Sequence, residues 1–393
     1  MKSKWVTRPL GELVQFTSGG TPSKKKTDYW IGNIPWISAK TLKSERISTS
    51  DLFISEDGLN AGSKLAPRGS ILLLIRGSGL FNGIPVGLVE REVAFNQDIK
   101  CLDSCSEVEN KFIFYWLISQ QKYLMAKVGV TGIGAGKFDL DFLQKLKVPV
   151  PSEQERTKII AIGDALSDKI ELNRKINENL ERQAQAIFQL WFTDKKEANG
   201  CLAGICQYSK EKVTVSSLDL ESYYSTENML PGKAGATQAA NLPTTAQTTK
   251  CNVGDILVSN IRPYFKKIVY CHADCGCSTD VLCFAPKKQE LSAYLFFLLY
   301  ADSFFDFMVA GSKGTKMPRG DKQQIMMYPV YVPSDEELAG FNDIAQPMLK
   351  QIQLNREENK RLIALRDTLL PKLMAGEVKI FQSQNILSNM MGT

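Results

Sequence analysis

The chain has 393 residues, a length typical of two or three domains. Hydrophobic residues make up 44% and charged residues 23%, which excludes a disordered or fibrous chain. A formal net charge of +6 permits contact with nucleic acid without demanding it. The longest apolar runs, Ile71 to Ile75 and Tyr294 to Tyr300, are too short to span a bilayer, and no signal-peptide core follows Met1. We therefore expect a cytoplasmic protein that does not contact a membrane.

The first 150 residues alternate short strand-like runs with turn signals. Gly19-Gly20-Thr21-Pro22 opens a loop that ends in Lys24, Lys25 and Lys26. An aromatic helix is expected over 108–127, and the glycine-rich loop Gly129 to Gly136 follows it. This mixture predicts an α+β domain with short twisted sheets. The strand-like runs cover residues 34–37, 71–76, 86–89 and 98–102.

A long helix is expected after Pro151. Ser152-Glu153-Gln154-Glu155 fits the capping box S-x-x-E, which satisfies the first free N–H groups of a helix. Apolar residues then recur about every seven positions along 153–191, a stretch that would be about 55 Å long as a helix. Because such a length is hard to bury against one small domain, we expect a partner helix.

Much of this pattern returns 182 residues later. Val150-Pro151-Ser152-Glu153 is repeated as Val332-Pro333-Ser334-Asp335, and Asp98-Ile99-Lys100-Cys101 as Asp280-Val281-Leu282-Cys283. A period near 180 residues is too long for a solenoid, whose units run about 20–50 residues, so we interpret it as a duplicated domain. The predicted organisation is a front domain at 1–150, a long helix at 151–192, a linker at 193–210, a second front domain at 211–332, a second long helix at 333–376 and a tail at 377–393.

The second copy repeats the order of the first. Strand-like runs occupy 256–259, 267–270 and 281–285, a helix is expected at 290–309, and a loop runs from Gly311 to Gly320. Upstream of these runs the two copies diverge beyond recognition.

The two long helices are expected to pair along a near-heptad seam. Asn173 and Asn355 take the same position in it, where a polar residue fixes register at a cost in stability, unless both face solvent. The expected seam residues are Ile159, Leu166, Asn173, Leu180 and Ile187, with Phe341, Met348, Asn355, Leu362 and Leu369. We also expect an apolar face free to dock other subunits, with Phe188, Trp191, Leu369 and Leu370 as candidates.

Basic side chains beside polar or aromatic ones are the candidate DNA contacts. Arginine pairs with guanine and asparagine with adenine, and we favour Arg76 and Arg262, which end equivalent strands, as groove readers. The loop with Lys137 offers phosphate contacts or is only a turn, and for Lys24 to Lys26 a solvated surface is an equal alternative. The candidates are Lys24, Lys25, Lys26, Arg76, Ser78 and Lys137 in the first copy, and Asn260, Arg262, Lys266, Lys313, Lys316 and Arg319 in the second.

We find no intact catalytic or metal-binding motif. Gly134-Ala135-Gly136-Lys137 lacks the first Gly and the Ser or Thr of a P-loop, and Asn260 to Tyr264 departs at Arg262 from the Asn-Pro-Pro-Tyr motif of adenine methyltransferases. Asp98-Ile99-Lys100 is too short for a nuclease metal site. The cysteines near His272, the only histidine, form no Cys-x-x-Cys pair, so we interpret them as core thiols. We expect no catalytic residue and no bound metal or cofactor.

Four features together carry a family resemblance. They are Leu10-Gly11-Glu12-Leu13, Gly19 to Ser23 before Ile34-Pro35-Trp36-Ile37, Val148 to Glu155 leading into a long helix, and Leu370-Pro371-Lys372-Leu373-Met374 ending the second. On these the sequence resembles the specificity subunits of type I restriction–modification systems over nearly the whole chain. The second front domain departs most, because it lacks a clear Gly-Gly-Thr-Pro stretch.

The resemblance implies a non-catalytic subunit with an α+β fold: two tandem α/β target recognition domains joined by two long antiparallel helices, with a pseudo-two-fold repeat. Each recognition domain would read one half of a bipartite site in double-stranded DNA. The helices would set the spacing and recruit two modification subunits that bind S-adenosylmethionine and methylate adenine. Restriction subunits would add ATP- and Mg²⁺-dependent translocation and cleavage. The alternative is a duplicated-domain DNA methyltransferase or nuclease acting alone.

Overall fold

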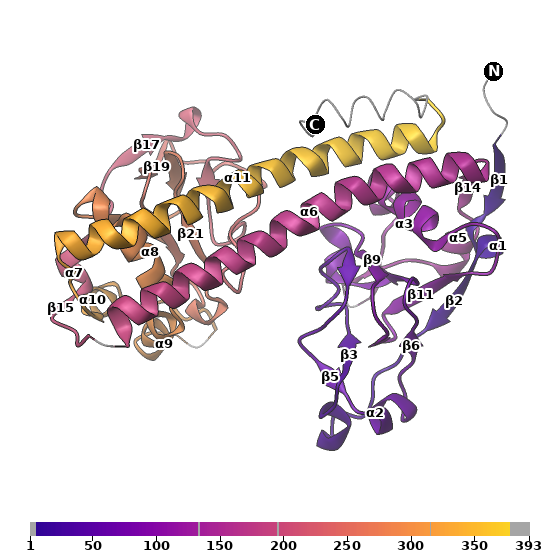
Figure 1. Cartoon of the computed structure of the whole chain (residues 1–393), viewed down its shortest axis with the longest axis horizontal. Helices are drawn as coiled ribbons and strands as arrows, with labels where there is room; N and C mark the ends of the chain where they lie inside the picture. The colour runs from indigo at the N-terminus through magenta and orange to yellow at the C-terminus, as the bar shows by residue number, and fades with distance from the viewer. Residues whose placement is uncertain (1–4, 133, 195, 315, 378–393) are drawn as a thin grey trace. The chain divides into compact units, whose positions relative to one another are not determined.

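The computed structural model describes residues 5–132, 134–194, 196–314 and 316–377. They form two compact units, each made of a front domain and segments of both long helices (Figure 1). Unit 1 takes its described residues from Met1–Leu172 and Glu358–Thr393, and unit 2 is Asn173–Glu357. These limits fall inside the long helices, and the domain limits expected from the sequence remain a prediction. Of the expected tail, only Glu377 lies within the described residues.

Unit 1 is built on two sheets. The larger has the strand order β2-β11-β7-β9-β4, and the smaller has the order β5-β3-β10-β6, with β3 and β10 parallel. The strands are β2 (Val14–Ser18), β11 (Ile99–Ser104), β7 (Ile71–Leu74), β9 (Val86–Val89), β4 (Arg46–Ile47), β5 (Phe53–Ile54), β3 (Ile34–Ile37), β10 (Val93–Phe95) and β6 (Leu65–Ala66). Two further strands, β1 (Val6–Pro9) and β14 (Lys147–Val150), form a separate antiparallel pair.

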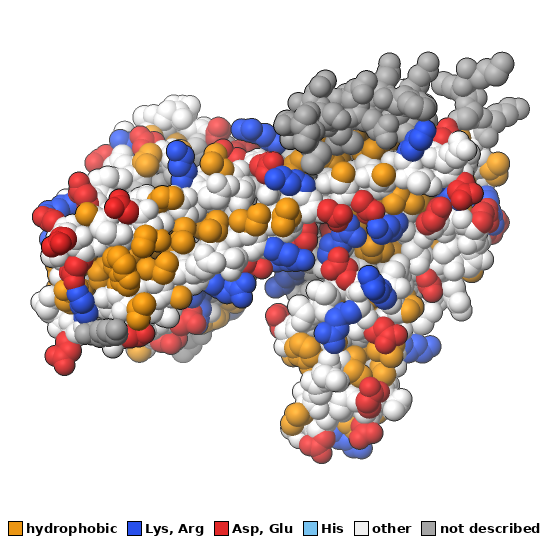
Figure 2. Space-filling view, viewed as in Figure 1, with side chains coloured by type: hydrophobic (Ala, Val, Ile, Leu, Met, Phe, Trp, Pro, Cys, Tyr) orange, Lys and Arg blue, Asp and Glu red, His pale blue; other side chains and the backbone are white. Residues whose placement is uncertain are grey.

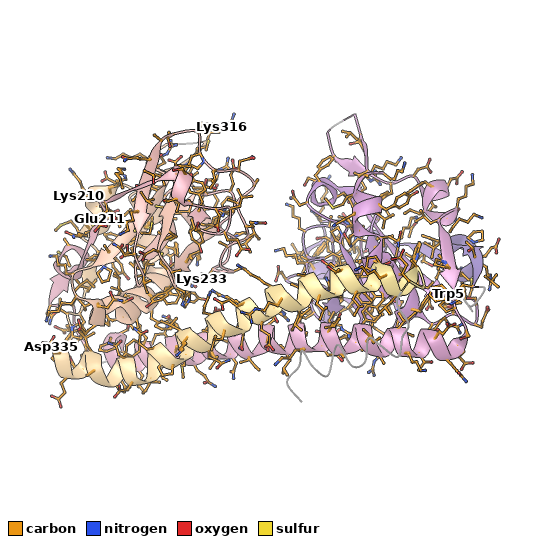
Figure 3. The ribbon with its side chains drawn as sticks, turned by 90° about the horizontal axis from the view of Figure 1, so that it is seen from above. Trp5, Lys210, Glu211, Lys233, Lys316 and Asp335 are labelled. Carbon is orange, nitrogen blue, oxygen red and sulfur yellow. The ribbon has the colours of Figure 1, made fainter. Side chains whose placement is uncertain are left out.

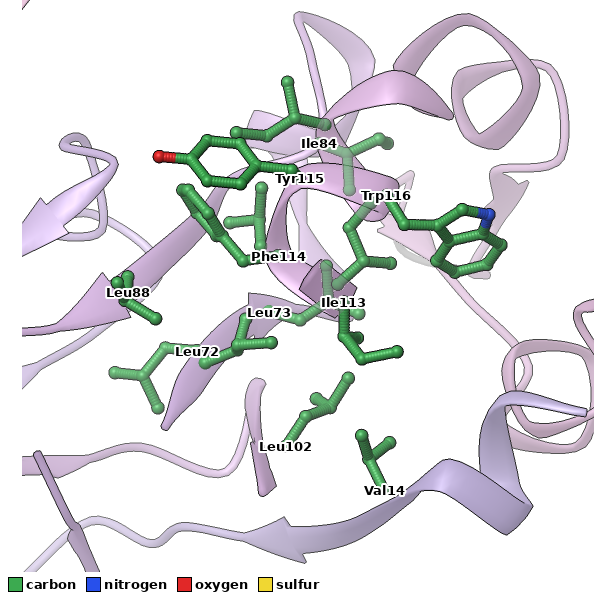
Figure 4. Packing of buried hydrophobic residues seen from close by; sticks show 14 of the residues in the cluster. Val14, Leu72, Leu73, Ile84, Leu88, Leu102, Ile113, Phe114, Tyr115 and Trp116 are labelled. Carbon is green, nitrogen blue, oxygen red and sulfur yellow. The ribbon is translucent and has the colours of Figure 1, made fainter. Parts of the chain in front are cut away.

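The core of unit 1 lies between the larger sheet and helix α3 (Asn110–Ser119) (Figure 4). All four residues of β7 are buried, as expected for a short continuous apolar run in the centre of a sheet. Helix α3 buries seven consecutive residues, from Phe112 to Ile118, so both sides of this helix are covered. The large aromatic rings of α3 therefore supply much of the apolar area that stabilises the unit.

Unit 2 repeats most of this topology in two four-stranded sheets. The first has the order β16-β23-β20-β21 and lacks a counterpart of β4, and the second has the order β17-β19-β22-β18, again with one parallel pair, β18 and β22. Strands β11 and β23 lie 182 residues apart, as the sequence repeat requires. The strands are β16 (Cys206–Tyr208), β23 (Val281–Pro286), β20 (Ile256–Ser259), β21 (Ile268–Tyr270), β17 (Lys212–Thr214), β19 (Gln247–Cys251), β22 (Cys275–Cys277) and β18 (Tyr223–Tyr224).

The aromatic helix expected in each copy is in fact two helices, which corrects the prediction. In unit 1, α3 stops at Gln120 and α4 (Gln121–Met125) follows. In unit 2, α8 (Ser292–Tyr300) and α9 (Asp302–Ala310) meet at Ala301, whose backbone is extended. The bend lets Phe304, Phe305 and Met308 of α9 enter the core that α8 already fills.

None of the helices within the described ranges is, on its own, long and apolar enough to cross a membrane. The bent pair Gln289–Tyr300 and Asp302–Ala310 meets that criterion jointly, by length and composition.

The two long helices start where the capping boxes predicted. Helix α6 (Glu153–Phe188) begins with reciprocal hydrogen bonds: the Ser152 N–H donates to Glu155 Oε2 over 3.1 Å, and the Glu155 N–H donates to Ser152 Oγ over 3.4 Å. Helix α11 (Asp335–Met374) repeats the arrangement with Ser334 and Glu337. Helix α6 continues as one π-helical turn over Gln189–Thr193.

Within unit 2 the two helices pair in antiparallel directions. The Asn355 Nδ2 donates to Asn177 Oδ1 over 2.8 Å, and the Asn177 Nδ2 donates to the Ile352 carbonyl over 3.3 Å. Farther along α6, the ring centroid of Phe188 lies 5.9 Å from that of Phe341, near the start of α11. Both asparagines are buried, so their amides are paired where an unpaired polar group would be costly. Asn355 thus bonds to Asn177, which lies one turn farther along α6 than the seam residue Asn173.

Most of the expected seam residues pack into the globular cores. The unit 1 core contains Ile159, Leu166, Leu362 and Leu369. The unit 2 core contains Phe341, with Ile187 and Met348 against it. Asn173 and Asn355 are buried, and Leu180 is half-buried.

Three of the four expected docking residues are buried, so that prediction is wrong for them. Phe188 belongs to the unit 2 core, and Leu369 and Leu370 belong to the unit 1 core, because the ends of the helices complete these cores. Trp191 is half-buried. Other apolar side chains are exposed along the helices instead (Figure 2). They are Leu172 and Ile363 in unit 1, and Ile176, Leu190, Ile344 and Leu354 in unit 2.

Gly163 is required where α6 crosses α3. A Cβ at this position would lie 2.7 Å from three carbons of the Tyr115 ring, whose hydroxyl donates to Asp164 over 2.7 Å. Gly340 on α11 has more room, because a Cβ there would lie 3.5 Å from its nearest neighbour, Trp191 Cζ3. We predict that Gly163→Ala lowers the free energy of unfolding by about 1–3 kcal/mol through overpacking.

The matched control is Gly340→Ala. It should raise the free energy of unfolding by up to about 1 kcal/mol, because alanine restricts the unfolded chain and favours the helix. Urea titrations of the full-length variants measure both changes. Equal effects of the two substitutions would contradict this account of the α6–α3 contact.

Candidate nucleic-acid interface

In unit 1, two candidate contacts from distant parts of the sequence are neighbours. The glycine-rich loop forms a hairpin of β12 (Gly129–Val130) and β13 (Gly136–Lys137), and β13 pairs with β8 (Arg76–Gly77). Lys137 stands directly opposite Arg76 in this three-stranded sheet. The Phe138 N–H continues the pairing by donating to the Ile75 carbonyl over 2.9 Å. The backbone therefore places a lysine and an arginine on one small surface.

Glycine makes this docking possible. A Cβ on Gly136 would lie 2.9 Å from Leu80 Cβ and 3.1 Å from the Gly77 carbonyl oxygen. The close approach of the two backbones thus requires an absent side chain at this position. The segment that resembles a broken P-loop is a hairpin that carries Lys137 to Arg76.

Arg76 is oriented by an aspartate. Its Nε lies 3.0 Å from Asp98 Oδ1, and about half of its side chain is exposed. An exposed ion pair of this kind adds little stability, about 0–1 kcal/mol, but it fixes the direction of the guanidinium. The remaining N–H groups of Arg76 stay available for an acceptor such as a base edge or a phosphate.

An open groove of about 640 Å³ runs beside the hairpin of unit 1. Lys127 and Lys137 are exposed in its lining and form no ion pair within the part of the chain that the structure describes. Asp139 is the one acidic residue of the lining, which is made up of Lys127, Gly129, Val130, Thr131, Gly132, Lys137, Asp139 and Phe142. The groove therefore favours an anionic occupant.

Unit 2 builds the same surface with different side chains. In its loop, Lys313 and Arg319 exchange two backbone hydrogen bonds of 2.9 and 3.0 Å. The loop docks on the segment after β20: the Arg262 N–H donates to the Pro318 carbonyl over 2.8 Å, and the Gly320 N–H donates to the Asn260 carbonyl over 3.3 Å. As in unit 1, a glycine-containing hairpin lies against the residues that follow the central strand.

The aspartate of the repeat is used in both units, but by different arginines. Asp280, the counterpart of Asp98, lies 3.2 Å from Nε of Arg319, which comes from the hairpin. Arg262 instead directs its Nη2 to the Lys316 carbonyl, at 3.4 Å. Arg319 contacts the aspartate of unit 2 as Arg76 contacts that of unit 1. In this respect Arg319, and not Arg262, corresponds to Arg76. The sequence showed both aspartates as matching positions of the repeat, but it gave no sign that each holds an arginine of the basic surface.

The candidate lysines of unit 2 differ in whether an ion pair with an aspartate holds their side chains. Lys313 pairs with Asp321 at 2.7 Å, and this lysine, followed by the backbone N–H groups of α10 (Lys322–Met326), lowers the pKa of Asp321. Lys266 pairs with Asp302 at 2.9 Å, where Lys233 binds as well, and the two lysines lower the pKa of Asp302. Lys316 is exposed and lies far from the helices, whereas Lys233 lies near them (Figure 3).

Asn260 is not presented at the surface. It is 5% exposed, and its Oδ1 has no hydrogen-bond partner among the described residues. In this structure it shapes the turn before Arg262, since its backbone carbonyl receives the hairpin. Ser78, the candidate that follows β8 in unit 1, is exposed.

No hydrogen bond or ion pair between described side chains joins Lys24, Lys25 or Lys26 to the hairpin of unit 1. Their loop begins close to Asp98, since the Thr21 Oγ1 donates to Gln97 Oε1 over 2.6 Å. It then runs away to the smaller sheet, where Lys26 Nζ lies 3.1 Å from the Tyr29 hydroxyl and over that ring. Lys24 and Lys25 are exposed.

The cysteines near His272 are core residues. Cys251, Cys271, Cys275, Cys277 and Cys283 share one buried cluster of unit 2. The sulfur atoms of Cys271 and Cys275 lie 3.6 Å apart, and all nine cysteines are free thiols. No group of three or more His, Cys, Asp or Glu side chains within the described ranges is arranged to hold a metal ion.

These features describe a class of protein that has two copies of one α+β domain, each with a basic hairpin, together with two long helices. Residues 2–182 match the family model for the type I restriction modification DNA specificity domain. The first copy therefore matches this DNA specificity domain, and the chain is similar to type I restriction enzyme specificity subunits.

Individual proteins show the same similarity. The specificity subunit of the type I restriction enzyme EcoR124I/EcoR124II from Escherichia coli is 32% identical over 184 residues, which are 46% of this chain and 44% of that subunit. The MjaIX specificity subunit of Methanocaldococcus jannaschii is 23% identical over 96% of this chain and 94% of its own length. The crystal structure of a type I S subunit from M. genitalium has the same fold, with a TM-score of 0.52 at 18% identity over 94% of this chain and 96% of that one.

We predict that Lys137→Ala and Lys316→Ala each weaken DNA binding to a similar extent on all sequences. Each removes one phosphate contact, so the slope of log affinity against log salt should become shallower by about 0.9. Fluorescence anisotropy on a labelled duplex at several salt concentrations measures the slope. Lys350→Ala, an exposed lysine on α11, is the control and should leave the slope unchanged. If the slope of log affinity against log salt is unaltered in all three variants, the hairpins do not contact DNA phosphates.

Proposed function

We propose that this chain supplies DNA specificity to a type I restriction–modification complex, with the front domain of each unit reading one half of a bipartite target in double-stranded DNA. The observation that carries the proposal is the basic hairpin docked after the central strand, present in both units on different side chains. A common scaffold with different surface residues is suited to reading two different half-sites.

We further propose that the chain is non-catalytic and works in the cytoplasm. S-adenosylmethionine, ATP and Mg²⁺ would then be bound by partner subunits. The family match favours this role over a duplicated methyltransferase or nuclease acting alone. Methyl transfer or cleavage by the purified chain without partners would overturn it.

The helices are the proposed assembly surface. They would set the distance between the half-sites and recruit two modification subunits, with restriction subunits joining the same complex. The apolar side chains exposed on α6 and α11 support this proposal, because exposed apolar patches on helices are typical of protein interfaces.

Methylome sequencing tests the reading function. A host that carries this chain with its modification partner should show adenine methylation at a motif of two short specific parts separated by unspecified bases. The same host without this chain is the control and should lack that motif. A continuous short motif, or none, would count against two separate readers.

Leu354→Glu tests the assembly surface. Leu354 is exposed on α11, and a carboxylate there would be desolvated without a partner if a modification subunit covers it. We expect its affinity for the modification subunit to fall about tenfold or more, measured by titration with the purified subunit. Lys350→Glu places a carboxylate nearby with a larger change in net charge, and it should still change this affinity little. Equal effects of the two substitutions would indicate a general electrostatic cause.

A further inference from the structure

Both units present aromatic side chains at the same place in the fold. In unit 1, the 3-10 turn η2 (Ser78–Phe81) follows β8 and ends in Phe81, which is 45% exposed. In unit 2, the 3-10 turn η5 (Pro263–Phe265) follows Arg262 and carries Tyr264 and Phe265, which are 50% and 40% exposed. The sequences of the two turns have nothing else in common, so the shared feature is the exposed aromatic ring.

These turns are fixed parts of the fold. In unit 1, the buried Leu80 anchors η2 beneath the hairpin, next to Gly136. In unit 2, the Phe265 N–H donates to the Arg262 carbonyl over 2.9 Å, and the Phe265 carbonyl accepts from the Gly232 N–H over 2.8 Å. The exposed rings are therefore carried by turns whose backbone is anchored to the fold, as a contact residue requires.

The backbone of η5 is strained on both sides. Arg262 and Lys266 both adopt the left-handed region, with φ of 51° and 50°, which residues other than glycine seldom occupy. Such conformations persist where the surrounding structure enforces them, and they cluster at binding sites. The two strained residues flank Tyr264 and Phe265, which are both exposed and have ring centroids 4.8 Å apart.

The basic residues close to these rings in the sequence indicate which kind of ligand binds there. Phe81 comes five residues after Arg76, whose strand partner is Lys137, and Tyr264 lies between Arg262 and Lys266. An occupant that is anionic along its length and offers flat apolar faces fits both properties. Duplex DNA does so, through its phosphates and its stacked bases.

We propose that Phe81 in unit 1 and the Tyr264–Phe265 pair in unit 2 stack on, or insert between, bases of the two half-sites. Part of the specificity then comes from the base step that each ring opens, since steps differ in how easily they unstack. A single phenylalanine in one unit and two adjacent rings in the other distort the two half-sites unequally. This inference rests on the proposed function and adds to it a mode of reading.

The test uses the assembled complex of the full-length chain with its modification subunits. Duplexes carry 2-aminopurine, whose fluorescence rises on unstacking, at successive positions of each half-site. We expect a rise at one step in each half-site. Phe81→Ala should abolish it in one half-site only, and the double variant Tyr264→Ala/Phe265→Ala in the other only. Each should weaken specific binding about 5- to 150-fold.

Conservative and distant substitutions serve as controls. Phe81→Trp and Tyr264→Phe keep a ring and should keep the fluorescence signal. Ile31→Ala in unit 1 and Met327→Ala in unit 2 remove other exposed apolar side chains and should change neither fluorescence nor affinity. Because all the targeted side chains are at least partly exposed, thermal melting should be unaltered, which separates a lost contact from a lost fold.

Two outcomes would overturn the inference while the proposed function stands. One is specific binding by the wild-type complex with no fluorescence rise at any position. The other is loss of subunit assembly in the alanine variants, measured by light scattering, with DNA binding per assembled complex unchanged, which would make the rings a protein interface. If the wild-type complex shows no bipartite specificity at all, the proposed function fails first, and the inference fails with it.

Discussion

Burial of the long helices in two hydrophobic cores is the constraint on which the structure depends. Ile159 and Leu166 of α6 lie in the unit 1 core, while Phe188 of the same helix lies in the unit 2 core. Helix α11 does the same in reverse, with Phe341 in unit 2 and Leu370 in unit 1. Each front domain is therefore completed by segments of both helices. The unit 1 core needs residues from the distant end of α11, whereas the unit 2 core is filled from one continuous stretch of sequence.

Paired polar groups accompany this burial. Within unit 2 the amides of Asn177 and Asn355 satisfy each other between the helices. Within unit 1 the buried Arg366 of α11 forms two hydrogen bonds with the carboxylate of Glu45, and the adjacent Arg46 pairs with Asp164 of α6. Buried polar pairs of this kind add little net stability but penalise other registers, because a shift would leave an amide or a charge without a partner.

Under the proposed function, the basic surfaces would let one scaffold carry two specificities. The hairpin, the turn after the central strand and the aspartate are common to both units, whereas the side chains that reach solvent differ. Asp98 forms an ion pair with Arg76, which lies on β8. Asp280 forms an ion pair with Arg319, which lies on the hairpin. Backbone pairing thus preserves the position of the surface while its chemistry changes, which is what reading different bases with one fold requires.

The elements that depend on local patterns could be predicted from the amino-acid sequence. The capping boxes at Ser152 and Ser334 located the starts of both helices, and the 182-residue repeat predicted the shared topology. The long-range contacts could not be predicted in this way: the burial of Phe188 and Leu370, the burial of Asn260, and the ion pair between Arg319 and Asp280 depend on the folded chain. Capping and periodicity act over a few residues and can be read from the chain. The docking of a hairpin on a distant strand is set by packing across the fold, which no local pattern encodes.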